Sequence, residues 1–85
     1  MAKKQQTVYE RYAAEEPARR RMIGARIREA RLRARMTQID VASAAGLNQQ
    51  RVSEAENVGV SIGPVLYAIA DVLGENPLAL AASEQ

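Results

Sequence analysis

The sequence contains no cysteine, histidine, tryptophan or phenylalanine, and its only aromatic residues are three tyrosines. Without cysteine the chain has no disulfide scaffold and no thiol chemistry, and without histidine it has no Cys/His metal site. Its carboxylates are scattered without a pattern that would form a pocket, so we expect no catalytic residue, no metal, no cofactor and no enzyme activity. RNA recognition commonly stacks bases on exposed aromatic side chains, which makes RNA a poor candidate for a partner.

Long apolar runs are also missing. No segment approaches the roughly 18 apolar residues of a membrane span, and the N-terminus, MAKKQQTVYE, lacks the apolar stretch of a signal peptide. We therefore expect a cytoplasmic protein with no membrane partner. A chain of 85 residues forms one small domain, which buries only about 60–65% of its unfolded surface. Self-association would bury further apolar surface and so help to stabilise a domain with so small a core.

The net charge of +2 conceals a strong asymmetry along the chain. Residues 1–35 contain eleven basic residues and four acids, a net +7, whereas residues 36–85 carry a net −5. Arg51 is the one basic residue after Arg35. A clustered basic segment is the electrostatic footprint of phosphate contact in nucleic-acid binding. A solvated, charged helix face is the simpler alternative.

Two helices are predicted in the N-terminal part of the chain. Thr7 with Glu10 is a capping-box pattern, so a short helix is expected over residues 8–14. Pro17 after two acids is typical of a first helical turn, so a separate helix is expected over residues 17–35. The buried stripe of that helix comprises four apolar residues at helical spacing, Ile23, Ile27, Ala30 and Ala34.

Residues 38–57, QIDVASAAGLNQQRVSEAEN, form a pattern of two short helices joined by a tight turn at Gly46. Glycine suits a turn that needs a left-handed backbone, and Thr37 and Asn48 are the predicted N-caps of the two helices. Six apolar residues fall on the facing sides, namely Val41, Ala42, Ala45, Leu47, Val52 and Ala55. The outer face of the second helix carries Gln49, Gln50, Ser53 and Glu54. A helix fits the DNA major groove, where glutamine can make two hydrogen bonds to adenine.

The C-terminal third predicts two further helices. Ser61 is the expected N-cap of the first, Pro64 is tolerated in its first turn, and Gly74 ends it. Its inner stripe comprises Ile62, Leu66, Ile69 and Leu73. Asn76 with Pro77 then begins a short terminal turn that carries Leu78 and Leu80.

With these residues the chain resembles the helix-turn-helix of the Cro/CI-like (XRE) transcriptional repressor family over about residues 22–73. The resemblance is carried by Gln38, Ala42, Gly46, the run Asn48 to Gln50, and the pair Glu56 and Asn57. It implies an all-α, five-helix, lambda-repressor-like DNA-binding domain in residues 17–85. Residues 1–16 are then an extension with a short additional helix. Two positions depart from the family pattern, because Arg35 and Val58 stand where glycine is common.

The resemblance also implies a function. It predicts a repressor that binds double-stranded DNA sequence-specifically, as a homodimer on a palindromic operator, with the recognition helix 49–56 in the major groove. No small-molecule effector is expected, and a regulator this small is typical of a plasmid or phage, located with the nucleoid or the plasmid. The alternative is an antitoxin or controller-type regulator that also binds a protein partner.

Individual roles follow from the same resemblance. Base contacts are assigned to Gln49, Gln50, Ser53 and Glu54, although outward side chains of an amphipathic helix are polar in any case. Phosphate contacts are assigned to Gln38, Asn48, Arg51, Arg28 and Asn57. Arg31 and Glu56 are expected to form a structural salt bridge. Leu78 and Leu80 are the predicted dimerisation residues, because apolar side chains at a chain end need cover, and Val8, Tyr9 and Tyr12 form the rival surface.

Overall fold

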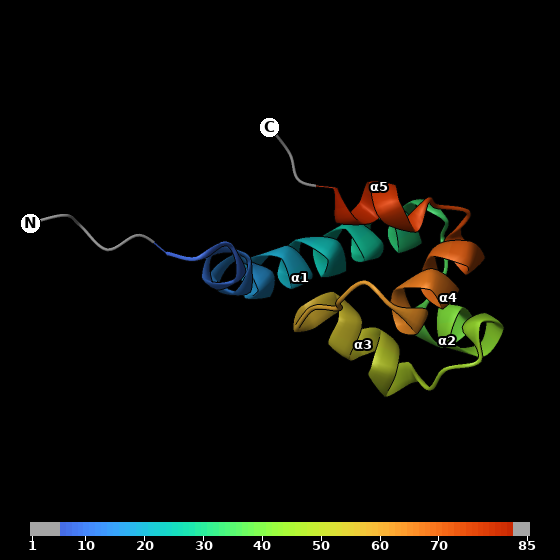
Figure 1. The fold of residues 1–85 in the computed structure, drawn as a ribbon. Helices are drawn as coiled ribbons and strands as arrows, with labels where there is room; N and C mark the ends of the chain where they lie inside the picture. The colour runs from blue at the N-terminus through green and yellow to red at the C-terminus, as the bar shows by residue number, and fades with distance from the viewer. Residues whose placement is uncertain (1–5, 83–85) are drawn as a thin grey trace, which may run out of the picture.

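The computed structural model describes residues 6–82, and this part of the chain is helical without a strand. Its helices are α1 (Val8–Arg33), α2 (Gln38–Ala45), α3 (Gln49–Asn57), α4 (Pro64–Leu73) and α5 (Pro77–Ala81). Helix α1 runs along the molecule, with α3 and α5 packed on it and α2 and α4 gathered near its C-terminal half (Figure 1). The predicted all-α class is confirmed.

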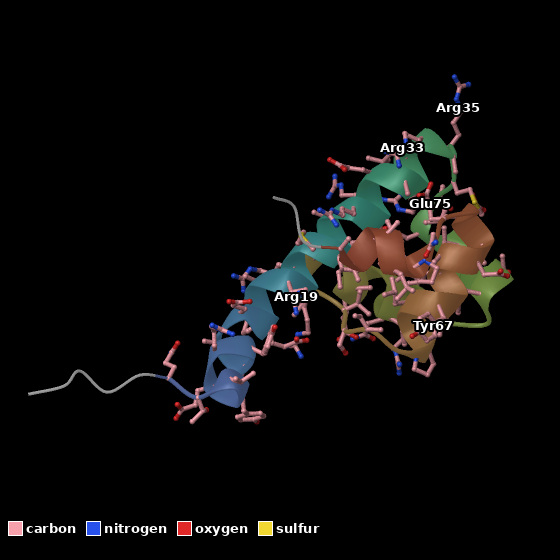
Figure 2. All side chains as sticks on the ribbon, turned by 45° about the horizontal axis from the view of Figure 1, so that its top comes forward. Arg19, Arg33, Arg35, Tyr67 and Glu75 are labelled. Atoms are coloured by element: carbon pink, nitrogen blue, oxygen red, sulfur yellow. The ribbon has the colours of Figure 1, made fainter. Side chains whose placement is uncertain are left out.

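Helix α1 is continuous from Val8 to Arg33, so the prediction of a separate short helix before Pro17 is wrong. The capping box is present: the Thr7 hydroxyl accepts from the backbone N–H of Glu10 at 3.1 Å, and the Thr7 N–H donates to the Glu10 carboxylate at 2.8 Å. The helix therefore begins nine residues before the proline. An interior proline costs about 3 kcal/mol and bends a helix rather than always ending it. The axis of α1 accordingly changes direction in its N-terminal part (Figures 1 and 2).

The first turns of α1 extend beyond the body of the protein as an arm. Val8, Tyr9 and Tyr12 are 65%, 80% and 52% exposed. They do not pack on the chain's own core.

The core joins one stripe of α1 to the inner faces of the other helices. It contains Ile23, Ile27, Val41, Ala42, Val52, Ala55, Leu66, Ile69, Ala70, Leu80 and Ala81. The predicted stripe of α1 is confirmed except for Ala34, which is exposed because the helix ends at Arg33. Arg35, just after the end of α1, takes a left-handed conformation, φ 58°. This turn is strained, since a non-glycine residue rarely adopts that conformation.

Helix α4 begins at Pro64, later than predicted, and Ser61 does not cap it. The residue before a proline is disfavoured in the helical region, so Gly63 is extended and the helix cannot include Ile62. That side chain is 50% exposed and lies outside the inner stripe, whereas Leu66 and Ile69 are fully buried. The predicted stop at Gly74 is confirmed by its left-handed φ of 70°.

Helix α5 is docked on α1 by its side chains and by its carbonyl end. Leu80 is only 6% exposed, whereas Leu78 is 65% exposed. The Arg26 guanidinium donates to the carbonyl oxygens of Leu80 at 2.9 Å and Ala82 at 2.6 Å. The dimerisation prediction for Leu80 is therefore corrected, because this side chain is part of the core of a single chain.

Helices α1 and α3 cross with their backbones in direct contact at Gly24. A Cβ added to Gly24 would lie 2.2 Å from the carbonyl oxygen of Ala55 and 3.1 Å from that of Glu56. This glycine sets how closely the two helices approach, a role that the sequence analysis did not assign.

Gly24→Ala is expected to destabilise the protein by about 1–3 kcal/mol, the usual cost of overpacking a tight contact. The sign is informative, because alanine in a helix is otherwise favoured over glycine by roughly 0.5–1 kcal/mol. Denaturant unfolding measures the difference. Gly63→Ala is the matched control, since nothing lies within 4 Å of its added Cβ. A more stable Gly24→Ala variant would show that the crossing is not tight.

Candidate nucleic-acid interface

The segment from α2 to α3 is held by local hydrogen bonds at each of its ends. Thr37 and Asp40 form a capping box, with bonds of 2.9 and 3.0 Å. The backbone N–H of Thr37, and then its side chain, lower the pKa of the Asp40 carboxyl. The Asn48 side-chain oxygen accepts from the backbone N–H of Arg51 at 2.8 Å, and Gly46 has the expected left-handed φ of 76°. These predicted caps and the predicted turn are confirmed.

Glu56 ties three helices together at the inner side of α3. Its carboxylate accepts from Arg31 Nε at 2.5 Å and Nη2 at 3.0 Å, and from Gln38 Nε2 at 3.2 Å. Arg31 also donates to the Met36 carbonyl at 2.9 Å. The hydrogen bond to Glu56 raises the pKa of Arg31 above its ordinary value despite burial. The predicted Arg31–Glu56 salt bridge is confirmed, and it fixes α3 relative to α1 and α2.

The opposite side of α3 is open to solvent. Gln49, Gln50 and Glu54 are exposed, and their side chains make no hydrogen bond with the described residues. Ser53 is half-buried, and its hydroxyl accepts from Asn57 Nδ2 at 3.1 Å. The structure thus brings the four predicted base-contact residues onto one face, with the two glutamine amides unengaged.

The predicted phosphate-contact residues border this face. Gln38 begins α2, Asn48 precedes α3 and Asn57 ends it, and Arg51 is exposed on the flank of α3. One amide hydrogen of Gln38 is occupied by Glu56, which leaves the other available. Arg28 is exposed on α1.

The arginines of α1 divide into two groups that the sequence did not distinguish. Arg26 holds α5, Arg31 holds α3, and Arg33 lies 3.9 Å from Glu75. By contrast, Arg21 and Arg28 are exposed and have no partner in residues 6–82. They lie at i−3 and i+4 from Gly24, on the edge of the face of α1 that contacts α3. Fewer arginines are therefore available to a ligand than the charge count indicates.

Within residues 6–82, no cluster of acidic side chains is arranged to hold a metal ion, and no helix has the length and apolar character needed to cross a membrane. Comparisons with models of known protein families and with curated proteins gave no match. The candidate interface is defined by the geometry around α3.

Proposed function

We propose that this chain is a transcriptional repressor that binds double-stranded DNA sequence-specifically, with α3 in the major groove. The observation that carries the proposal is the exposed pair Gln49 and Gln50, on a helix whose inner face is fixed by Glu56 and whose first turn is capped by Asn48. The major groove is about 12 Å wide and admits one helix. A rigid helix that presents two free amides can read adenine there.

The polar and basic residues around α3 support the same proposal. Side-chain amides at the start of α2 and at both ends of α3, with Arg51 on the flank, surround α3 and would face the two DNA strands with this helix in the groove. Such contacts to phosphate position a protein on the duplex, while contacts to base edges specify the sequence.

A homodimer is part of the proposal because one recognition helix reads only a few base pairs. Dimers of this motif place two helices in half-sites about 34 Å apart. Both apolar surfaces that the sequence indicates for pairing are exposed: Leu78 on α5, and the arm with Val8, Tyr9 and Tyr12. We assign the interface to Leu78.

Replacing Gln49 or Gln50 with alanine is expected to cost about 1–3 kcal/mol on the specific site and to relax the preference at one base pair. Affinity for unrelated DNA should hardly change. Fluorescence anisotropy measures the affinity of each variant for two duplexes. One is selected from a random library by the unaltered protein, and the other has a mixed sequence.

Gln6→Ala is the control for these variants, because it removes the same side chain from an exposed position before α1. It should bind both duplexes normally. An equal loss on both duplexes by Gln49→Ala and Gln50→Ala would show that these amides contact the DNA backbone rather than the bases.

Leu78→Ser is expected to convert the dimer to a monomer with unchanged helical content, since Leu78 lies outside the core. Tight operator binding should be lost with it, because the two weak half-site contacts are no longer linked. Sedimentation gives the mass of each variant. Removal of residues after Asn76 is the poorer test, as it would also take Leu80 and Ala81 out of the core.

Tyr9→Ser with Tyr12→Ser is the counterpart on the arm. If that double variant is monomeric while Leu78→Ser remains dimeric, the interface is N-terminal and the assignment to α5 is wrong.

A further inference from the structure

A surface pocket of about 310 Å³ lies between α1, α3, the loop that follows α3 and the start of α4. Arg20, Arg51, Glu54 and Ser61 provide its charged and hydroxyl groups. It adjoins the exposed face of α3 but reaches onto α1, outside the helix-turn-helix. Figure 1 shows the end of α3 and this loop running close to α1.

The backbone of Arg20 is fixed against this loop. The Val60 N–H donates to the Arg20 carbonyl oxygen at 3.2 Å. Gly59, with φ 129°, approaches so closely that an added Cβ would lie 2.8 Å from the Arg20 carbonyl carbon. The side chain of Arg20 therefore starts from a fixed point beside α3, even though its guanidinium is exposed.

Both guanidinium groups of the pocket are unengaged. The side chains of Arg20 and Arg51 form no hydrogen bond or ion pair in the described part of the chain, and neither does the hydroxyl of Ser61. This distinguishes Arg20 from Arg26 and Arg31, which hold α5 and α3 in place, and from Arg33, whose guanidinium lies 3.9 Å from the Glu75 carboxylate.

We infer that Arg20 and Arg51 bind one backbone phosphate of the DNA from two sides, in addition to the contacts made by the helix-turn-helix. Two arginines against Glu54 give the lining a net positive charge. A guanidinium matches phosphate oxygens with paired hydrogen bonds, and Ser61 can donate a further one. The inference rests on the proposed function, because α3 in the groove brings a strand to Arg51. It extends the footprint along α1 by a residue outside the motif.

Arg20→Gln tests this directly, since it removes the charge but keeps the backbone contacts. We expect a loss on the order of tenfold on both the selected duplex and a mixed-sequence duplex, as for one charge-assisted contact. The slope of log affinity against log salt should fall by about one per chain. Arg20→Lys should retain the slope and lose part of the affinity, because lysine keeps the charge without the planar fork.

Arg35→Gln is the matched control. It removes the same charge two residues beyond the C-terminal end of α1, where Arg35 points away from the body (Figure 2). The two residues are about 22 Å apart along the chain at the helical rise, beyond the screening length of about 8–10 Å. We expect less than about a twofold change for this variant, since such separated charges are largely screened.

Glu54→Gln tests whether a more positive pocket binds DNA more tightly. Removing the one acid of the pocket should strengthen binding to the mixed-sequence duplex. Neutral methylphosphonates introduced singly into the selected duplex then locate the phosphate: one position should weaken the unaltered protein clearly more than it weakens Arg20→Gln, in which only Arg51 still contacts that phosphate.

The outcomes separate the two claims. If the unaltered protein binds neither duplex, the proposed function fails. If it binds both, but Arg20→Gln behaves as Arg35→Gln does, the phosphate site is overturned while the proposed function stands. A loss confined to the selected duplex would also overturn it, since that indicates a base contact.

Discussion

Replacing Glu56 with alanine is expected to lower the free energy of unfolding by about 3–5 kcal/mol, the cost of removing one partner of a buried ion pair. The Glu56 side chain has no exposed surface and accepts three hydrogen bonds. Its removal leaves the Arg31 guanidinium buried beside an apolar core with only the Met36 carbonyl as acceptor. A domain of this size is stable by roughly 4–13 kcal/mol, so much of the fold's stability depends on this carboxylate.

Arg31→Ala should be comparably destabilising, because it leaves the buried Glu56 carboxylate with Gln38 as its only hydrogen-bond donor. The double variant should lose less than the sum of the two single losses. Neither uncompensated charge remains in it, and a buried pair contributes little beyond what its apolar replacement would. Thermal and denaturant melts of the four proteins complete the cycle.

Glu54→Ala is the control for this cycle, since it removes the same carboxylate two residues away from an exposed position. It should melt close to the unaltered protein. Strict additivity of the Arg31 and Glu56 losses would show that the two residues do not stabilise each other in solution. If a single variant does not fold, refolding of the double variant still reports the coupling.

Helix starts were predictable where the signal is local. Thr37 and Asn48 cap through bonds that reach only three residues along the chain, so sequence spacing contains the whole interaction. The same holds for Gly46 and Gly74, where the backbone conformation selects the residue. These positions depend little on how the helices pack.

Helix boundaries at prolines were less predictable, because the cost of placing a proline inside a helix competes with the tendency of the preceding residues to form helix. Pro17 is compatible with a first turn and with a bent interior, and the outcome depends on how well the preceding residues form helix. At Pro64 the deciding effect was available in the sequence, since proline restricts the residue before it. A serine N-cap at Ser61 is favourable locally, but it cannot offset that restriction at Gly63.

Most tertiary contacts could not be predicted from the sequence. Leu78 and Leu80 look alike in the chain, but docking of α5 by Arg26 buries one and exposes the other. Gly24 carried a usable signal, an isolated glycine inside a helical pattern. Arg20 carried none, because its place beside α3 depends on the loop at Gly59. The Arg31–Glu56 pair was predicted only through the family resemblance.

Raising the salt concentration from 50 to 200 mM is expected to weaken DNA binding on the order of a thousandfold, through the counterions that bound arginines release. Four exposed arginines on or beside the α3 side have no partner in residues 6–82, and phosphate contacts are proposed for three of them, Arg20, Arg28 and Arg51. Three arginines that contact phosphate per chain give about six charged contacts per dimer and a slope of log affinity against log salt near −5. Anisotropy titrations at several salt concentrations measure this slope.

The slope also counts how many basic residues reach DNA. If most of the basic residues of the N-terminal half contacted phosphate, the slope of a dimer would be well beyond −10, since each contact adds about −0.9. We expect a lower number because three arginines of α1 already have partners within the protein and phosphate contacts are proposed only for Arg20, Arg28 and Arg51. Potassium glutamate in place of chloride, at matched concentrations, controls for anions that bind the protein. A flat response would contradict the DNA-binding proposal itself, since no arrangement of Gln49 and Gln50 alone would hold the protein on a charged duplex.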